Sequence, residues 1–383
     1  MSDLNLRMTN EQEGLRDSVR ALFARKFDRE YVRECDRNRR PPTEAFDELG
    51  RLGFLGINID EKYDGGGSGA SMVAVLLEEL GRGFLDLAFW AFRNLGHGGH
   101  GIGLHGTLEQ KSRFLPALAS GKLSVCFALT EPDSGSDAAS IQTVATKTSD
   151  GYRITGEKIF CSGFKVSDYV LTATRTSTGA RKHQGITLLL VPTNAPGLTW
   201  RPLETLGHWP LGTAMLHFDD VHVGEENRLG LQDEGWPILM DVLEFERLCL
   251  SAARVGAAQS ALEDALQYAK QRHQFGQPIG SFQAVSHKLA EMQVMVDISR
   301  MLVYRFAALI DRGENTVRDA ATLKLYVSEA YKSVADMGLQ ILGGYGYTME
   351  YDLQRHFRES RLGTIGAGTS EIQRNIIAKT MGV

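Results

Sequence analysis

The spacing of hydrophobic residues divides the chain into three stretches. From Thr9 to about Leu118 the spacing is helical, as in the runs TNEQEGLRDSVRALFARKF and SMVAVLLEELGRG. The first run opens with Thr9 and Gln12 at the spacing of a capping box, in which each side chain bonds the other residue's backbone N–H. This stretch is therefore predicted to be helical.

Between about Leu123 and Leu229 the pattern changes to short, β-rich segments separated by Gly, Pro and polar turns. The segments are GYRITGEKIFCSG, DYVLTATRT, GITLLLVP, LTWRPL and TAMLHFDDVHV. No long helical run interrupts them, which disfavours a parallel, doubly wound sheet. We expect a compact β domain.

From Gly235 to Lys379 the helical spacing returns in three long runs, followed by a terminal helix. Small residues repeat along these runs and indicate close helix packing in a bundle. The predicted fold is α+β and mostly helical. It has an N-terminal helical domain at residues 1–122, a central β domain at 123–232 and a C-terminal helical bundle at 233–383.

Composition narrows the possible functions. The 383 residues are 43% hydrophobic and 23% charged, as in ordinary soluble proteins, and the net charge of −5 argues against a nucleic-acid partner. No apolar run approaches the roughly 18 residues of a membrane helix, and the polar N-terminus does not resemble a signal peptide. Four unpaired cysteines suggest reduced thiols and a cytoplasmic location: Cys35, Cys126, Cys161 and Cys249.

The segment GHGGHG, at residues 96–101, satisfies the G-x-G-x-x-G pattern. That pattern indicates dinucleotide binding only between a strand and a helix, whereas the preceding region here is helical. We therefore expect a flexible connection between two helices. His97, His100 and His105 are close in sequence, but no carboxylate or cysteine completes a ligand set at convincing spacing, so no metal site is predicted.

Two loops are candidates for ligand binding. FALTEPDSGSDAASIQT, at residues 127–143, runs from a strand-like start into small hydroxyl residues that suit a flavin edge or phosphates, although an ordinary polar turn has the same composition. TIGAGTSEIQRNIIAK, at residues 364–379, leads into the first turn of a helix, where free N–H groups bind anions. Ala367, at the centre of this loop, offers no acid, base or nucleophile.

Five motifs occur in the order and at the spacing of the acyl-CoA dehydrogenase flavoprotein family, and the similarity extends along nearly the whole chain. They are ALTEPDSGSD, KIFCSG, RHQFG, QILGGYGYTMEY and IGAGTSEIQR. The resemblance implies a helical N-terminal domain, a central β domain and a C-terminal four-helix bundle. It also implies bound FAD and a homotetramer.

The resemblance assigns residues to the cofactor. Those beside the flavin would be Phe127, Leu129, Thr130, Phe160 and Ser162, and many relatives have Trp in place of Phe160. Ser136 would face the FAD pyrophosphate or the acyl-thioester arm. Thr369 and Glu371 would hold the diphosphate and ribose region. Residues that would reach the ADP half across a subunit interface are Arg272, Phe275, Gln283, Gln340 and Gly344. Bundle packing is the alternative for Phe275 and Gln340, whereas a guanidinium such as that of Arg272 suits a diphosphate.

The implied reaction is the α,β-dehydrogenation of an acyl-CoA thioester, in which a base removes the α proton and the β hydrogen leaves as hydride. Many family members carry the base at the position of Ala367. A minority, isovaleryl-CoA dehydrogenase among them, place a glutamate followed by arginine on the first bundle helix, and LEFERLCL matches with Glu246 and Arg247. The resemblance thus implies Glu246 as the base and a hydrogen bond from the backbone N–H of Ala367 to the thioester carbonyl. The residues assigned to substrate are Ser136, Arg247 and Gly368.

Other interpretations remain open at this level. Glu246 could be a solvated helix acid, and Glu244 is a natural control, since two residues on a helix point about 200° apart. The leading function is a dehydrogenase that passes electrons to an electron-transfer flavoprotein. The alternatives are a flavin oxidase or monooxygenase, an acyl-carrier-protein-linked dehydrogenase, and a non-catalytic FAD-binding subunit. The sequence does not indicate the length or branching of the acyl chain.

Overall fold

A computed structural model describes residues 8–383, which form two compact units. The bundle unit comprises residues 8–34, 69–89 and 247–383, and the sheet unit comprises residues 35–68 and 90–246. Helix α8 (Gly235–Gln271) begins in the sheet unit and continues into the bundle unit. Each unit is described by itself.

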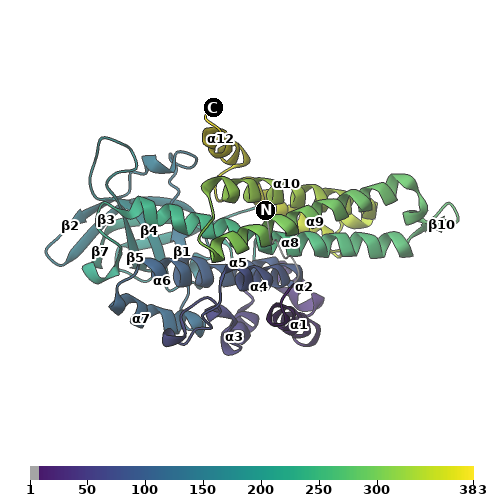
Figure 1. The fold of residues 1–383 in the computed structure, drawn as a ribbon, viewed down its shortest axis with the longest axis horizontal. Coiled ribbons are helices and arrows are strands. Elements are labelled where there is room, and N and C mark those ends of the chain that lie inside the picture. Colours follow the sequence, from purple (N-terminus) through teal and green to yellow (C-terminus); the bar gives the residue numbers. More distant parts are fainter. Residues whose placement is uncertain (1–7) are drawn as a thin grey trace. The chain divides into compact units, whose positions relative to one another are not determined.

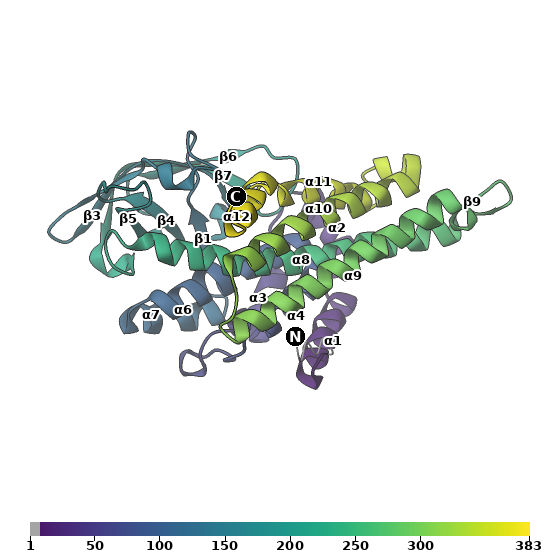
Figure 2. The same cartoon turned by 45° about the horizontal axis from the view of Figure 1, so that its top comes forward.

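Long helices dominate the bundle unit (Figures 1 and 2). Helix α10 (Val317–Leu342) packs on α9 (Gln283–Asp311), α11 (Leu353–Gly363) and α12 (Ser370–Thr380). A short hairpin of β9 (His273–Gln274) and β10 (Gln277–Pro278) joins α8 to α9. The predicted long helices are confirmed, but α11 was not predicted.

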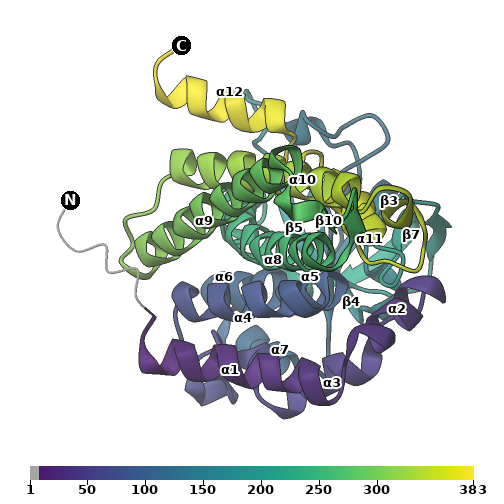
Figure 3. The same ribbon diagram turned by 90° about the vertical axis from the view of Figure 1, so that its right-hand side faces the viewer.

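The N-terminal part of the bundle unit contains α1 (Asn10–Arg25) and α4 (Ala70–Gly83), which lie side by side (Figure 3). The predicted capping box of Thr9 and Gln12 is confirmed, with both reciprocal hydrogen bonds present. Helix α4 approaches α8 through two glycines: a Cβ on Gly81 would lie 2.0 Å from the carbonyl oxygen of Ala253, and a Cβ on Gly256 would lie 1.8 Å from that of Glu78. Any side chain at either glycine would force the two helices apart.

The sheet unit contains an eight-stranded sheet in which β1 pairs with β4 and the other strands follow the order β6-β7-β3-β2-β4-β5-β8. Pairing is antiparallel except where β4 meets β1 and β2. The strands are β1 (Val125–Ala128), β2 (Val144–Lys147), β3 (Gly151–Ser162), β4 (Tyr169–Arg175), β5 (Ile186–Pro192), β6 (Leu198–Leu203), β7 (Thr213–Gly224) and β8 (Arg228–Leu229). The predicted β-rich segments are confirmed as β3 to β7.

Further helices complete the fold. The α-helices are α2 (Arg29–Arg37), α3 (Thr43–Arg51), α5 (Leu85–Arg93), α6 (Gly101–His105) and α7 (Leu108–Ala119). A π-helical segment, η3 (Asn94–His100), connects α5 to α6. The 3₁₀ turns are η1 (Phe54–Gly56), η2 (Glu61–Tyr63), η4 (Ala138–Ser140), η5 (Phe164–Val166), η6 (Glu225–Asn227), η7 (Ile279–Ser281) and η8 (Gly343–Tyr347).

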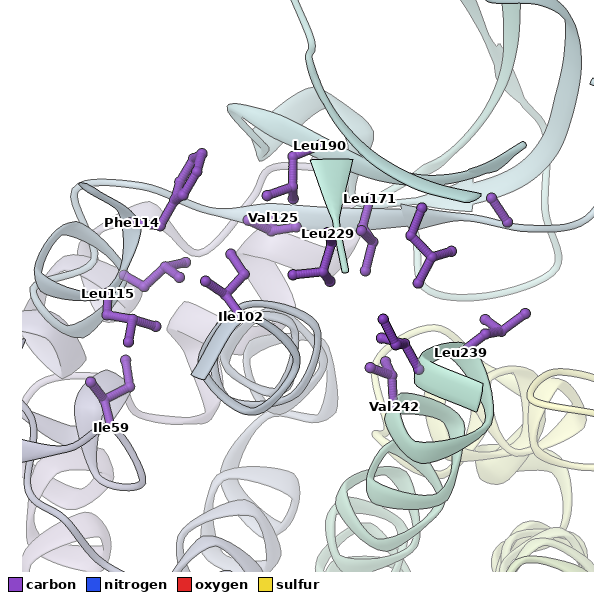
Figure 4. Packing of buried hydrophobic residues seen from close by; sticks show 14 of the residues in the cluster. Ile59, Ile102, Phe114, Leu115, Val125, Leu171, Leu190, Leu229, Leu239 and Val242 are labelled. Atoms are coloured by element: carbon purple, nitrogen blue, oxygen red, sulfur yellow. The ribbon is translucent and has the colours of Figure 1, made fainter. Parts of the chain in front are cut away.

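The core of the sheet unit determines which face of α8 is buried. Figure 4 shows Leu239 and Val242, from the first turns of α8, meeting Ile102, Leu171 and Leu229 in one apolar cluster. Residues three, four and seven positions apart share a helix face. Glu246, seven positions after Leu239 and four after Val242, therefore continues this buried stripe.

The predicted fold class is confirmed: helices precede and follow a central, mostly antiparallel sheet. All four cysteines are buried free thiols. Across residues 8–383, no helix combines the length and apolar character needed to cross a membrane.

Candidate active site

Glu246 lies on α8 as the last residue of the sheet unit, and its side chain is only 12% exposed. Its Oε2 lies 3.3 Å from Nε2 of His97. A carboxylate so far removed from water requires a polar partner, and His97 supplies one. Glu246 is therefore a largely buried, hydrogen-bonded acid, unlike the solvated helix acid of the alternative interpretation.

His97 connects Glu246 to a residue that the sequence assigns to the flavin. Its ring centroid lies 5.0 Å from that of Phe127, on β1, and 4.9 Å from that of Phe92. The structure thus brings Phe127 and Glu246 into contact with the same histidine. The sequence analysis missed this residue because its partner is 149 positions away along the chain.

The prediction of a flexible connection at residues 96–101 is wrong, because this segment is helical throughout. The amide of Asn94 donates to the carbonyls of Leu118 and Leu123 at 3.2 and 2.9 Å, and the amide of Asn58 donates to Leu95 at 2.9 Å. These bonds fix the π-helical turn from outside. A rigid helical turn, rather than a loop, thus presents His97.

The other two histidines of this region share a different carboxylate of α8. His100 and His105 place Nε2 at 3.0 and 2.8 Å from Oδ2 of Asp241, and the His100 ring stacks on Phe245 with centroids 4.1 Å apart. Burial opposes ionisation of Asp241, but the two imidazole hydrogen bonds outweigh it and hold its pKa well below the ordinary value. The carboxylates beside these three histidines, Asp241 and Glu246, are both on α8 and are far from the histidines in the sequence.

The loop after β1 is anchored by a buried ion pair. Lys158, fully buried on β3, donates to Oε1 of Glu131 at 2.8 Å and to the carbonyl of Leu129 at 3.0 Å. Burial lowers the pKa of Lys158 to about 8, although Glu131 opposes the shift. Burial would raise the pKa of Glu131, but the charge of Lys158 and hydrogen bonds from Thr143 and Gln142 lower it.

Residues assigned to the flavin gather along β1, β3 and the loop between β1 and β2. The N–H of Ile159 donates to the carbonyl of Thr130 at 2.9 Å, which sets Leu129 and Thr130 beside Phe160. Phe160 sits at an irregularity in the β3–β7 register, with φ of 61° and 62% of its surface exposed. Ser162, two residues on, hydrogen-bonds Thr213 across the strands, and Ser136 is exposed.

The loop before α12, in the bundle unit, contains the other predicted catalytic position. Ala367 and Gly368 both have positive φ, of 55° and 83°. Lys324 donates to the carbonyl of Gly368, and Gln373 donates to the carbonyls of Ala367 and Gly368 at 3.2 and 3.0 Å. The two carbonyls thus accept hydrogen bonds from side chains of α10 and α12.

The same loop leaves backbone donors available. Thr369 caps α12 by accepting from the N–H of Ile372 at 3.2 Å. Within residues 8–383, the N–H groups of Ala367, Gly368 and Thr369 donate no hydrogen bond. The exposed Glu371 has a lowered pKa, caused by its own backbone N–H and the Thr369 hydroxyl. This arrangement suits an anionic or carbonyl oxygen.

The five residues predicted to cross a subunit interface are all exposed on the bundle unit. The Arg272 guanidinium lies over the ring of Tyr345, 5.7 Å from the ring centroid. Tyr345 directly follows Gly344 in the sequence. Phe275 is 93% exposed at the tip of the β9–β10 hairpin, and Gln283 and Gln340 lie at helix ends. Exposure to this degree disfavours the alternative in which Phe275 serves bundle packing.

Known proteins resemble this chain along its full length. Three family models of acyl-CoA dehydrogenase domains match the chain. The N-terminal domain model matches residues 9–122, the middle domain model residues 126–221, and the C-terminal domain model residues 233–382. The chain is 37% identical over 381 residues to the probable acyl-CoA dehydrogenase YngJ of Bacillus subtilis, covering 99% of this chain and 100% of that protein.

Two further similarities are informative. The caffeyl-CoA reductase-Etf complex subunit CarC of Acetobacterium woodii is 32% identical over 375 residues, with 97% of this chain and 98% of that protein covered. The solved structure of butyryl-CoA dehydrogenase from Megasphaera elsdenii superposes with a TM-score of 0.95 at 32% identity, covering 99% of this chain and 100% of that one.

Proposed function

The chain belongs to the acyl-CoA dehydrogenase family of FAD-dependent oxidoreductases, and we propose that Glu246 is the base that removes the α proton of its acyl-CoA substrate. The observation that carries this proposal is the burial of the Glu246 carboxylate on the core-facing stripe of α8, beside His97 and Phe127. The sequence LEFERLCL, with alanine at position 367, also supports the proposal, because it resembles the minority of the family that has its base on the first bundle helix.

FAD is the cofactor of this family, and two features of the chain fit it. Phe160 exposes most of its ring in a backbone conformation that non-glycine residues seldom adopt, which suits contact with a flat ring system. The N–H groups of Gly368 and Thr369, which donate no hydrogen bond within residues 8–383, suit a diphosphate at a helix N-terminus. When bound, FAD supplies the hydride acceptor of the reaction.

The protein's own groups then have separate tasks. Glu246 takes the α proton, while the N–H of Ala367 donates to the thioester carbonyl oxygen, where negative charge develops as the proton leaves. Ser136, Arg247 and Gly368 are proposed to contact the substrate. Because an N–H donor needs no side chain, alanine at position 367 is compatible with this task.

Further residues are proposed to bind the cofactor. Phe127, Leu129, Thr130, Ser136, Phe160 and Ser162 would contact the flavin side, and Thr369 and Glu371 the diphosphate and ribose. The exposed set Arg272, Phe275, Gln283, Gln340 and Gly344 is proposed to hold the ADP half of FAD in a neighbouring subunit. A site shared in this way requires at least two subunits, and the family resemblance supports a homotetramer.

We propose an electron-transfer flavoprotein as the electron acceptor, supported by the similarity to an Etf complex subunit. The test is anaerobic mixing of the purified holoprotein with straight- and branched-chain acyl-CoAs, followed by exposure to air. A dehydrogenase loses its flavin absorbance with at least one acyl-CoA and reoxidises slowly in air. Rapid reoxidation by oxygen would identify an oxidase, and bleaching only by carrier-protein thioesters would change the substrate class.

A further inference from the structure

We propose that His97 is a positioning residue for the base: it donates from Nε2–H to Oε2 of Glu246 and so leaves Oε1 to take the substrate's α proton. The proposal deepens the function proposed above and rests on the assignment of Glu246 as the base. It gives a role to a histidine inside a glycine-rich helical turn, where neither helix propensity nor apolar packing requires one.

The imidazole is held firmly enough to act in this way. His97 is 3% exposed, and its ring packs between Phe92, in an edge-on contact, and Phe127. Within the described chain, His97 is the residue to which the Glu246 side chain is hydrogen-bonded. A ring that cannot turn restricts the carboxylate it holds to one orientation.

The surroundings of His97 also favour one tautomer of its ring. Nδ1 is buried, and within residues 8–383 it has no hydrogen-bond partner. A proton on Nδ1 would leave a donor unsatisfied among aromatic rings, which costs more than an unsatisfied lone pair. The neutral tautomer with its proton on Nε2 avoids this cost, and it is the form that can donate to Glu246.

The backbone around His97 lies close to α8 on one side and to α7 on another. A Cβ on Gly101 would lie 3.3 Å from a methyl of Val242, and a Cβ on Gly98 would lie 2.8 Å from a methyl of Leu118. Side chains at these positions would push the turn outward and lengthen the bond between His97 and Glu246. The glycines of GHGGHG thus serve helix packing, and the packing sets the position of His97.

Neighbouring ionisable groups are engaged elsewhere. Asp241, five positions before Glu246 on α8, is hydrogen-bonded to both His100 and His105. His97 and Glu246 therefore form a separate pair. Removing the imidazole of His97 is expected to free the Glu246 carboxylate without transferring another histidine to it.

Three substitutions separate a positioned donor from simple packing. Glutamine places its amide nitrogen close to where histidine has Nε2, whereas asparagine places its nitrogen close to Nδ1. With the acyl-CoA that bleaches the wild type fastest, His97→Leu should slow bleaching roughly 10- to 100-fold, the scale of a misplaced reacting group. His97→Gln should stay close to the wild-type rate, and His97→Asn should be as slow as His97→Leu.

Further readouts distinguish positioning from damage to the fold. His97→Leu should keep its FAD content and its circular dichroism spectrum, and it should show a larger isotope effect with α-deuterated substrate, because proton removal has become slower. His105→Gln, which alters the neighbouring Asp241 cluster, is the matched control and should keep the wild-type rate. A wild-type rate in His97→Leu, or equal slowing in all three His97 variants, would overturn the proposal.

The outcome for Glu246→Gln separates this proposal from the one it rests on. If Glu246→Gln retains the wild-type rate, the assignment of the base is wrong. If Glu246→Gln is slow but His97→Leu is fast, the base stands and only the positioning role fails. In the Glu246→Gln background, His97→Leu should cause little further loss, because the two residues act as one unit.

Discussion

At the scale of single residues, the site depends on polar groups that have left water and found partners. Glu246 is hydrogen-bonded to His97, and Asp241 is hydrogen-bonded to two imidazoles. Lys158 donates hydrogen bonds to Glu131 and to a backbone carbonyl. Removing one member of such a pair leaves the other buried without its partner, which costs more than the pair contributes. Substitutions that remove one member of such a pair should therefore lower the free energy of unfolding.

The Lys158–Glu131 pair gives a direct prediction of stability. Lys158→Met leaves the Glu131 carboxylate buried without its cation and should lower the free energy of unfolding by about 3–5 kcal/mol. The double variant Lys158→Met with Glu131→Gln should be less destabilised than the single one. Denaturant unfolding monitored by circular dichroism measures both free energies of unfolding. Equal losses of stability in the two variants would show that the unpaired charge of Glu131 does not cause the destabilisation.

At the scale of elements, the loop before α12 combines a strained backbone with a helix N-terminus. Gly368 has φ of 83°, and a Cβ there would lie 2.7 Å from the amide nitrogen of Gln373, which holds the loop carbonyls. Gly366, two residues earlier, has its nearest contact at 3.5 Å. A methyl group at residue 368 would therefore clash with Gln373, whereas a methyl group at residue 366 would make only ordinary van der Waals contacts.

Gly368→Ala should therefore lower FAD retention, because it distorts the N–H groups proposed to face the diphosphate. Gly366→Ala should leave retention unchanged. Flavin absorbance per protein after gel filtration measures both variants, with circular dichroism as a check of helix content. Full FAD retention in Gly368→Ala would contradict the role assigned to this loop.

Elements with a clear period were predictable from the sequence, and contacts between distant segments were not. The long helices correspond to extended runs with few turn residues, and β3 to β7 correspond to short β-rich runs bounded by Gly, Pro and polar residues. The turn at residues 96–101 was misjudged because its glycines, which by propensity favour a loop, allow close helix packing here. The pairing of His97 with Glu246 depends on how η3 packs on α8, which neither segment reveals by itself. Helix α11, which is rich in charged residues, lacks the apolar stripe that identified the longer helices.

At the scale of the whole molecule, the proposed cofactor site extends over a subunit interface. The evidence within one chain is the row of exposed residues near the β9–β10 hairpin, above all Phe275 at its tip. An aromatic side chain with this exposure places apolar surface in water, and aromatic residues are enriched at protein interfaces.

Arg272→Ala should weaken FAD retention and the oligomer together, because one guanidinium is proposed to serve the diphosphate of a neighbouring subunit. Analytical ultracentrifugation and flavin absorbance on the same samples measure the two properties. Lys270→Ala, two residues earlier on the exposed side of α8, is a control for loss of charge and should change neither. A monomeric Arg272→Ala protein with full FAD would contradict the shared site.

The central claim is that Glu246 removes the α proton, and anaerobic stopped-flow bleaching of Glu246→Gln and Glu244→Gln tests it most directly. With FAD content confirmed in both variants, Glu246→Gln should bleach roughly 10²- to 10⁴-fold more slowly than the wild type, the contribution of a positioned base. Glu244→Gln should bleach at nearly the wild-type rate, because its side chain leaves α8 in another direction. Fast bleaching by Glu246→Gln, or slow bleaching by Glu244→Gln alone, would contradict the account.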